Sequence, residues 1–225
     1  MSLATYSHAF AVIAYGALAV TLVHRWQPTS RSPALALLTV CALLSTGWGG
    51  FNLWAQLGGG NRSVALASVL DLARYAALLG FALLLLGSGA GRRRRMPLAV
   101  MALVAVGALT IIVVARASGG SAAAWLAGYV PLASLALPVV GMLLVEQLYR
   151  SSAEGSRWRM KPLCLALAIL FIYDIFIHSG VLLFGRFDTD ALTVRSAAHA
   201  LAAPLLYIAS QRQAHWSAPF QLSRD

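Results

Sequence analysis

The sequence predicts an all-α membrane protein, a bundle of seven transmembrane helices. The 225-residue chain is 60% hydrophobic and only 11% charged, and its mean hydropathy is +0.76. Its apolar residues gather in seven runs, and a helix needs about 20 apolar residues to cross a bilayer. The runs are continuous, whereas a membrane β-barrel would alternate apolar and polar residues in segments of about ten. The seven runs are Leu3–Val23, Pro33–Trp54, Val64–Leu86, Met96–Val114, Ala123–Leu148, Pro162–Phe184 and Ala191–Ile208.

Residues around the runs support each helix in turn. The first run is long and has no basic segment before it, so we expect a spanning helix rather than a cleaved signal peptide. The second run ends in a Gly- and Trp-rich segment, and the third follows the short loop Gly58–Ser63. Backbone groups in lipid must be paired internally, which makes each run a helix.

The last four runs are separated by basic or polar loops. The fourth follows four consecutive arginines, and the sixth follows the longest polar loop, Ser151–Lys161. The fifth run contains Pro131 and Pro138, and the seventh contains Pro204. Because proline cannot donate a backbone hydrogen bond, we expect each of these prolines to kink its helix.

The placement of Lys and Arg predicts the orientation, because cytoplasmic loops are enriched in these residues. With the N-terminus outside, twelve of the seventeen basic residues fall in the inside loops and tail, and four fall in outside loops or outer helix ends. We therefore expect one domain over residues 1–225, with an outside N-terminus and a cytoplasmic tail over 209–225. The inside residues are Arg25, Arg31, Arg92, Arg93, Arg94, Arg95, Arg150, Arg157, Arg159, Lys161, Arg212 and Arg224, and the outside ones are Arg62, Arg116, Arg186 and Arg195.

The net charge of +10 has its densest source in one predicted inside loop. Arg92, Arg93, Arg94 and Arg95 stand between two spanning helices, where each gains about 1 kcal/mol from an anionic lipid surface. We expect anionic lipids as their partners, and no nucleic acid. Cysteines and histidines show no metal-binding spacing, so no metal or cofactor is expected.

Ionisable residues inside the predicted helices are the candidate site, because such groups are costly in a bilayer and usually face a bundle interior or a wet cavity. They are Asp71 and Arg74, Asp174 and His178, and His199. A rise of 1.5 Å per residue places all five roughly 9–16 Å below the outer helix ends. Asp71 and Arg74 are three apart and Asp174 and His178 four apart, so each pair lies on one side of its helix.

Two interpretations of this cluster stay open. The five groups form buried ion pairs and hydrogen bonds that lock the third, sixth and seventh helices, or they line a polar pocket that opens outward for a ligand or proton. Asn52, near the outer end of the second helix, is a further candidate for the pocket.

The segment around Asn52 is rich in tryptophan and glycine. Trp48 and Trp54 are expected in the aromatic belt at the outer interface. Three glycines of the same segment permit close helix packing or a distorted turn. They are Gly47, Gly49 and Gly50.

The inner end of the fifth helix carries a second candidate. Glu146 and Arg150 are four residues apart in the orientation that favours an ion pair. With Tyr149 they form either an interfacial anchor or a point of coupling to the cytoplasm.

Several motifs together resemble the N-terminal membrane region of the PEP-CTERM/exosortase-associated membrane histidine kinases. An LxEQLYR-like helix end is followed by an RW…KFLCLGLGGLFAYDF-like helix in that family, and a D/E-x-x-R-Y-like element precedes them. The corresponding segments here are Leu144–Arg150, Arg157–Phe184 and Asp71–Tyr75. The tail matches a W-S-x5-S-R pattern at Trp216, Ser217, Ser223 and Arg224.

The resemblance implies a sensory input module of the bacterial inner membrane, linked to exosortase/PEP-CTERM (exopolysaccharide) systems. It implies a cytoplasmic kinase domain as partner and a possible homodimer. No kinase glycine motif or phosphoacceptor histidine occurs in the chain, so we expect no enzyme activity. Two alternatives remain, a small-molecule or proton-coupled transporter and a seven-helix zinc hydrolase using Asp174, His178 and His199.

Overall fold

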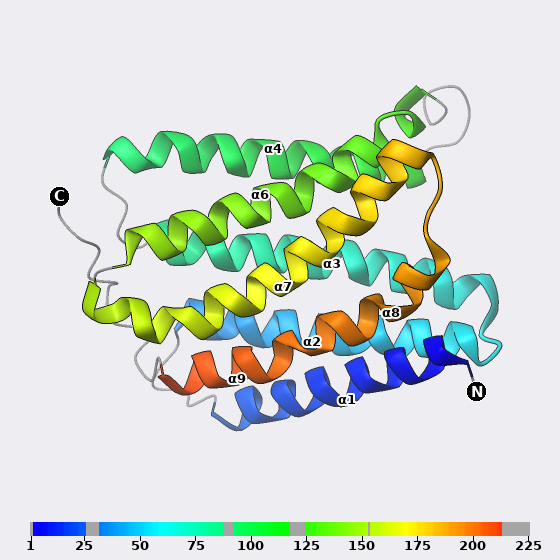
Figure 1. The fold of residues 1–225 in the computed structure, drawn as a ribbon, viewed down its shortest axis with the longest axis horizontal. Coiled ribbons are helices and arrows are strands. Elements are labelled where there is room, and N and C mark those ends of the chain that lie inside the picture. The colour runs from blue at the N-terminus through cyan, green and yellow to red at the C-terminus, as the bar shows by residue number, and fades with distance from the viewer. Residues whose placement is uncertain (1, 26–31, 88–91, 118–124, 153, 213–225) are drawn as a thin grey trace.

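In the computed structural model, the described part of the chain is a bundle of long helices (Figure 1). The described residues are 2–25, 32–87, 92–117, 125–152 and 154–212. Seven stretches are long and apolar enough to cross a membrane, which identifies a multi-pass membrane protein. The helices are α1 (Leu3–His24), α2 (Pro33–Gln56), α3 (Gly60–Gly87), α4 (Arg92–Ala117), α6 (Val130–Ser151), α7 (Glu154–Phe184), α8 (Thr189–Ala200) and α9 (Ala202–Arg212).

Six of the seven spans close into a ring, and the seventh lies outside it. Neighbours around the ring are α1, α2, α3, α6, α7 and the α8–α9 pair, which returns to α1. Helix α4 packs on α3 and α6 from outside, and its span is the least buried of the seven. The interior of the ring is therefore shared by five or six helices, and polar groups there are shielded from lipid on every side.

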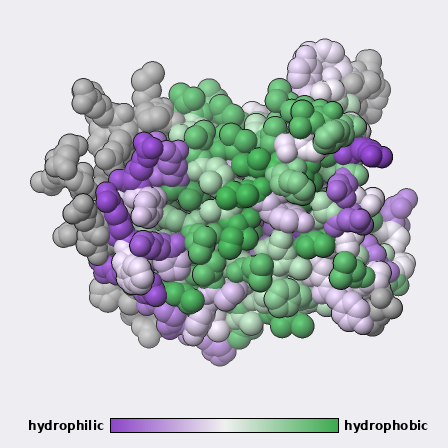
Figure 2. All heavy atoms as spheres, in the orientation of Figure 1, coloured by the Kyte–Doolittle hydropathy of each residue, from purple (hydrophilic) through white to green (hydrophobic). Residues whose placement is uncertain are grey.

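The surface has the pattern that a bilayer requires. A broad hydrophobic belt crosses the face shown in Figure 2, and hydrophilic side chains gather at its two ends. Large apolar side chains such as Ile13, Leu103 and Leu183 are 69%, 73% and 75% exposed. Exposing so many apolar side chains to water in one contiguous belt would be unfavourable, whereas lipid tails solvate them.

Several helices extend beyond the predicted boundaries. Helix α7 begins at Glu154 rather than Pro162, and α3 begins at Gly60 rather than Val64. The apolar runs mark the part of each helix that crosses the membrane, while the backbone hydrogen bonds continue into polar residues at the ends. The tail beyond Arg212 and the side chains of Arg92, Arg93, Arg94 and Arg95 lie outside the described part.

The prediction that each proline kinks its helix is wrong at Pro131. Pro131 stands in the first turn of α6, which begins at Val130 instead of Ala123, and a proline in a first turn removes no intrahelical bond. The predicted helix 191–208 is interrupted near Pro204, as expected, and consists of two helices, α8 and α9, that meet at Leu201. Because Pro204 has no N–H, the Ala200 carbonyl loses its helical partner, whereas the Leu201 amide still donates to the Ala197 carbonyl over 3.3 Å.

Glycines let three pairs of helices approach closely. An added Cβ at Gly49 would lie 3.2 Å from Val12 of α1, and one at Gly47 would lie 3.2 Å from Leu70 of α3. At Gly50 an added Cβ would meet nothing within 4 Å, so this glycine makes no close helix contact. The tightest position is Gly141 of α6, where a Cβ would lie 2.6 Å from the Phe171 ring of α7.

We expect Gly141→Ala to lower the free energy of unfolding by about 1–3 kcal/mol, because the methyl group would overlap the fully buried Phe171 ring. The measurement is unfolding in mixed SDS micelles, followed by circular dichroism. Gly107→Ala in α4 is the matched control, since its Cβ meets nothing within 4 Å. Equal stability of the two variants would show that α6 and α7 do not pack as described.

Candidate functional site

An arginine at the centre of the ring joins three helices. The Arg195 guanidinium of α8 donates through Nε and Nη2 to the Asp174 carboxylate of α7, over 2.7 and 2.9 Å. Its Nη1 and Nη2 also donate to Asp71 of α3, over 2.9 and 3.3 Å. The planar fork of arginine suits two carboxylates at once, so one side chain fixes α8 against both neighbours.

A second arginine completes the ion pairs from α3. The Nε of Arg74 donates to Asp71 Oδ1 over 2.7 Å. Its guanidinium lies over the Trp48 ring of α2, 3.9 Å from the centroid, and Arg195 lies 5.3 Å from the same ring. The negative face of an indole stabilises a cation in this position. Within the described residues, Arg74 Nη1 and Nη2 have no hydrogen-bond partner.

Asp174 is the acceptor on which the network converges. Besides Arg195, it accepts a hydrogen bond from the Tyr75 hydroxyl of α3 and contacts His199 Nε2 at 3.1 Å. The side chain is 1% exposed. A carboxylate so deeply buried needs several donors to replace its hydration, and three different side chains supply them here.

Helix α1 holds α8 from the other side. The Tyr15 hydroxyl donates to the His199 carbonyl over 2.7 Å. Nearer the end of the bundle, His8 Nδ1 lies 2.7 Å from Ser196 Oγ, and the Ala197 amide donates to Ser7 Oγ over 2.9 Å. These bonds make α8 the most polar packing partner of α1, although both belong to membrane spans.

The charges of the network balance, and two of its members are partly exposed. Two arginines face two carboxylates, so the group is neutral when His199 is neutral. Arg74, Asp174 and His199 are each 1% exposed, whereas Asp71 is 25% exposed and Arg195 11%. Asp71 and Arg195 are therefore the members that a molecule from outside the bundle reaches first.

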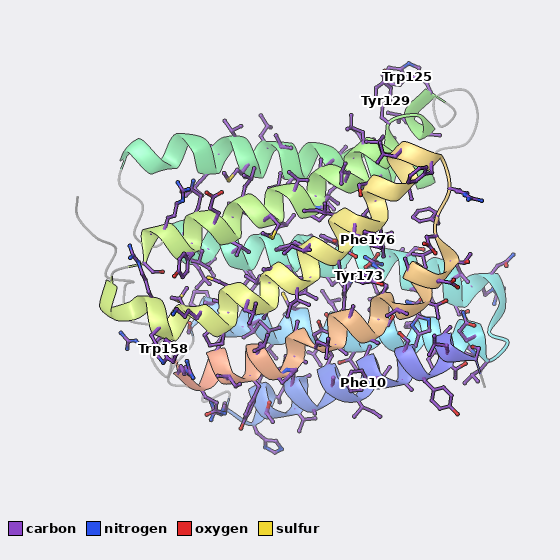
Figure 3. The ribbon with its side chains drawn as sticks, viewed as in Figure 1. Phe10, Trp125, Tyr129, Trp158, Tyr173 and Phe176 are labelled. Atoms are coloured by element: carbon purple, nitrogen blue, oxygen red, sulfur yellow. The ribbon has the colours of Figure 1, made fainter. Side chains whose placement is uncertain are left out.

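The structure brings together four of the six predicted residues of the cluster: Asp71, Arg74, Asp174 and His199. Asn52 instead donates to the Trp48 carbonyl one turn earlier in α2, over 2.8 Å. His178 lies against the Phe187 ring, with the two centroids 6.4 Å apart. Tyr173, on the same helix, faces α8 and donates to the Ala191 carbonyl over 2.8 Å (Figure 3).

Sequence reasoning missed the two most informative members of the network. Arg195 was expected among the charges of the outside loops and outer helix ends, yet it bridges the two carboxylates. Trp48 was expected in the aromatic belt, but it is 4% exposed and lies inside the ring, where its face is covered by the arginines. The signal for Arg195 was its spacing of four residues from His199, which places both on one face of a helix.

The predicted coupling residues lie on the surface at the opposite end of the bundle. Arg150 Nη2 and Glu146 Oε1 are 2.8 Å apart, with side chains 73% and 46% exposed. Tyr149 is 40% exposed. The expected ion pair is present, and a role in coupling stays a prediction.

Comparisons with known proteins give no relatives. No protein-family model, curated protein or solved structure matches this chain. The fold and the site therefore define the class by themselves: a multi-pass helical membrane protein with a buried, charge-balanced network between its spans.

We expect Arg195→Gln to lower the free energy of unfolding by about 3 kcal/mol or more, because it leaves the buried Asp174 carboxylate without its charged partner. Arg150→Gln, which breaks an exposed pair, is the control and should cost under about 1 kcal/mol. Both are measured by unfolding in mixed SDS micelles. The double variant Asp174→Asn/Arg195→Gln should lose less free energy of unfolding than the two single variants lose together. Additive losses of free energy would contradict the pairing.

Proposed function

We propose that the chain is a membrane-embedded signal-input module of the bacterial inner membrane. One observation carries the proposal: a single arginine on the broken last span holds carboxylates from two other spans. An arrangement of this kind has two discrete alternatives, paired and released, and a switch needs a bistable element. The resemblance to the membrane region of PEP-CTERM/exosortase-associated histidine kinases supports the same function.

The signal enters from the side of the network that is open. Helix α8, which carries Arg195, lies toward the end of the bundle that holds the N-terminus (Figure 1), and the distribution of arginines predicts that this end is outside. A ligand or proton that binds Asp71 better when Arg195 is released shifts the bundle toward the released packing. The size of that shift is set by the difference in affinity between the two packings.

The response leaves through the last span. Arg195 lies on α8, and the break at Leu201 separates it from α9, which runs to Arg212 at the opposite end. Movement of α8 therefore reaches the cytoplasmic end as a change in the angle or position of α9. The partner there is a kinase domain, as the resemblance implies, and homodimers form through it.

The zinc hydrolase has less support than the signal-input module. Among the described residues, no three His, Cys, Asp or Glu side chains lie close enough together to hold a metal ion. That alternative required Asp174, His178 and His199 to converge, whereas His178 lies against Phe187. Catalytic zinc normally needs three protein ligands.

We expect Asp174→Asn and Arg74→Gln to change the output of a transcriptional reporter by about five-fold or more, because coupling energies between sites are typically 1–3 kcal/mol. The reporter is read in cells and normalised to the amount of protein in the membrane fraction. Arg62→Gln, at the same end of the bundle but outside the network, should keep wild-type output. Wild-type output from both network variants, at normal abundance, would reject the signal-input function.

Fusions at the C-terminus test the orientation. A fluorescent protein that matures only in the cytoplasm should give full fluorescence there, and alkaline phosphatase at the same position should be inactive. We expect a cytoplasmic C-terminus because arginines are in excess at that end of the bundle. Active phosphatase would reverse the orientation and place Asp71 and Arg195 toward the cytoplasm.

A further inference from the structure

The beginning of α7 and the end of α9 meet at one end of the bundle, around an exposed tryptophan. Trp158 is 65% exposed, and it lies where the two helices come together (Figure 3). The apolar span of α7 starts at Arg157, and the last span ends at Arg212, so Trp158 stands at a membrane boundary. Tryptophan is enriched at that depth because its ring is apolar and its N–H is polar.

Two cations from different helices share this ring. Lys161 Nζ lies 4.6 Å from the Trp158 ring centroid, and the Arg212 guanidinium carbon lies 5.8 Å from it. The two charges are therefore no further apart than the sum of these distances. Within the described residues, neither of them forms an ion pair with a carboxylate. An anion beside the ring would be attracted by both charges.

Pro162 leaves a backbone carbonyl of α7 free to accept a hydrogen bond from Arg212. Pro162 lies inside α7 and has no N–H, so the carbonyl of Trp158, four residues earlier, has no helical partner. Arg212 Nη1 donates to that carbonyl over 3.4 Å. One nitrogen of the guanidinium thus contacts α7, and the guanidinium lies beside the Trp158 ring.

We propose that Trp158, Lys161 and Arg212 form a binding site for the phosphate headgroup of an anionic phospholipid. A membrane lipid fits better than a soluble anion, because the exposed indole lies at the bilayer boundary, where a headgroup phosphate sits above acyl chains. Arginine offers two donors in a fork that matches phosphate oxygens, and lysine adds a point charge. The residues of this site belong to α7 and α9, whereas Arg92, Arg93, Arg94 and Arg95 are the first residues of α4.

The site connects lipid composition to the last span. A bound headgroup would hold the end of α9 against α7, since Lys161 belongs to one helix and Arg212 to the other. This consequence rests on the site alone and does not require the proposed signal-input function.

The test compares the thermal stability of the full chain in two nanodiscs, one of phosphatidylcholine and one in which about a quarter of the lipid is phosphatidylglycerol. The wild-type apparent Tm should be several degrees higher in the anionic nanodisc. The double variant Lys161→Gln/Arg212→Gln should lose at least about half of that shift. Arg62→Gln/Arg186→Gln is the matched control, because it removes the same charge from exposed positions at the other end, and it should keep the shift.

A purely structural role for Arg212 would lower the Tm equally in both nanodiscs and leave their difference unchanged, which would overturn the proposal. An equal loss of the shift in the control would also overturn it, because bulk charge would then explain the effect. A third arm adds inorganic phosphate to the phosphatidylcholine nanodisc. A full shift from phosphate alone would reject the lipid and assign the site to a soluble anion. Trp158→Phe keeps an aromatic ring and should reduce the shift partially, and an unchanged shift there would remove Trp158 from the site.

Discussion

The ion pairs of Arg195 with Asp71 and Asp174 are the interaction on which the interior of this bundle depends. Each charge alone would be very unfavourable between membrane spans, and each is tolerated because the others are in place. The rest of the network follows from this constraint. Tyr75 and His199 supply Asp174 with further partners, and Trp48 offers its ring to the arginines. Removing one member leaves another exposed to a medium that cannot solvate it.

The sequence alone predicted the membrane spans and most residues of the network. It did not predict the roles of Arg195 and Trp48 at the centre of the network. Hydropathy identifies seven spans because lipid exposure and helix length are properties of continuous runs. The pair Asp71 and Arg74 follows from helical spacing within one segment. Arg195 could not be assigned in this way, because its partners belong to α3 and α7, and only the tertiary packing brings them within 3 Å. The prediction for Trp48 was wrong for the same reason, because its position near a helix end is compatible with both the lipid boundary and the interior.

Two internal prolines change the backbone hydrogen bonds of their helices in different ways. Each internal proline removes one backbone donor and leaves a carbonyl four residues earlier without its helical bond. At Pro162 the freed Trp158 carbonyl is taken by Arg212, which joins α7 to the end of α9. At Pro204 the same loss coincides with the break between α8 and α9. One proline therefore supports a contact between helices and the other interrupts a helix, although the covalent cause is identical.

These features place the two ends of the last span in different environments. At one end Arg195 is buried among opposite charges, and at the other Arg212 is exposed beside a like charge. Seventeen residues separate them, about 25 Å along a helix, with the junction of α8 and α9 at Leu201 between. The backbone between them stays helical, because Leu201 has α-helical dihedral angles and its amide donates to the Ala197 carbonyl over 3.3 Å. Only the Ala200 carbonyl loses its helical partner, at Pro204. The coupling between Arg195 and Arg212 therefore depends on this turn and on its packing, where Ala200 and Ala202 are fully buried.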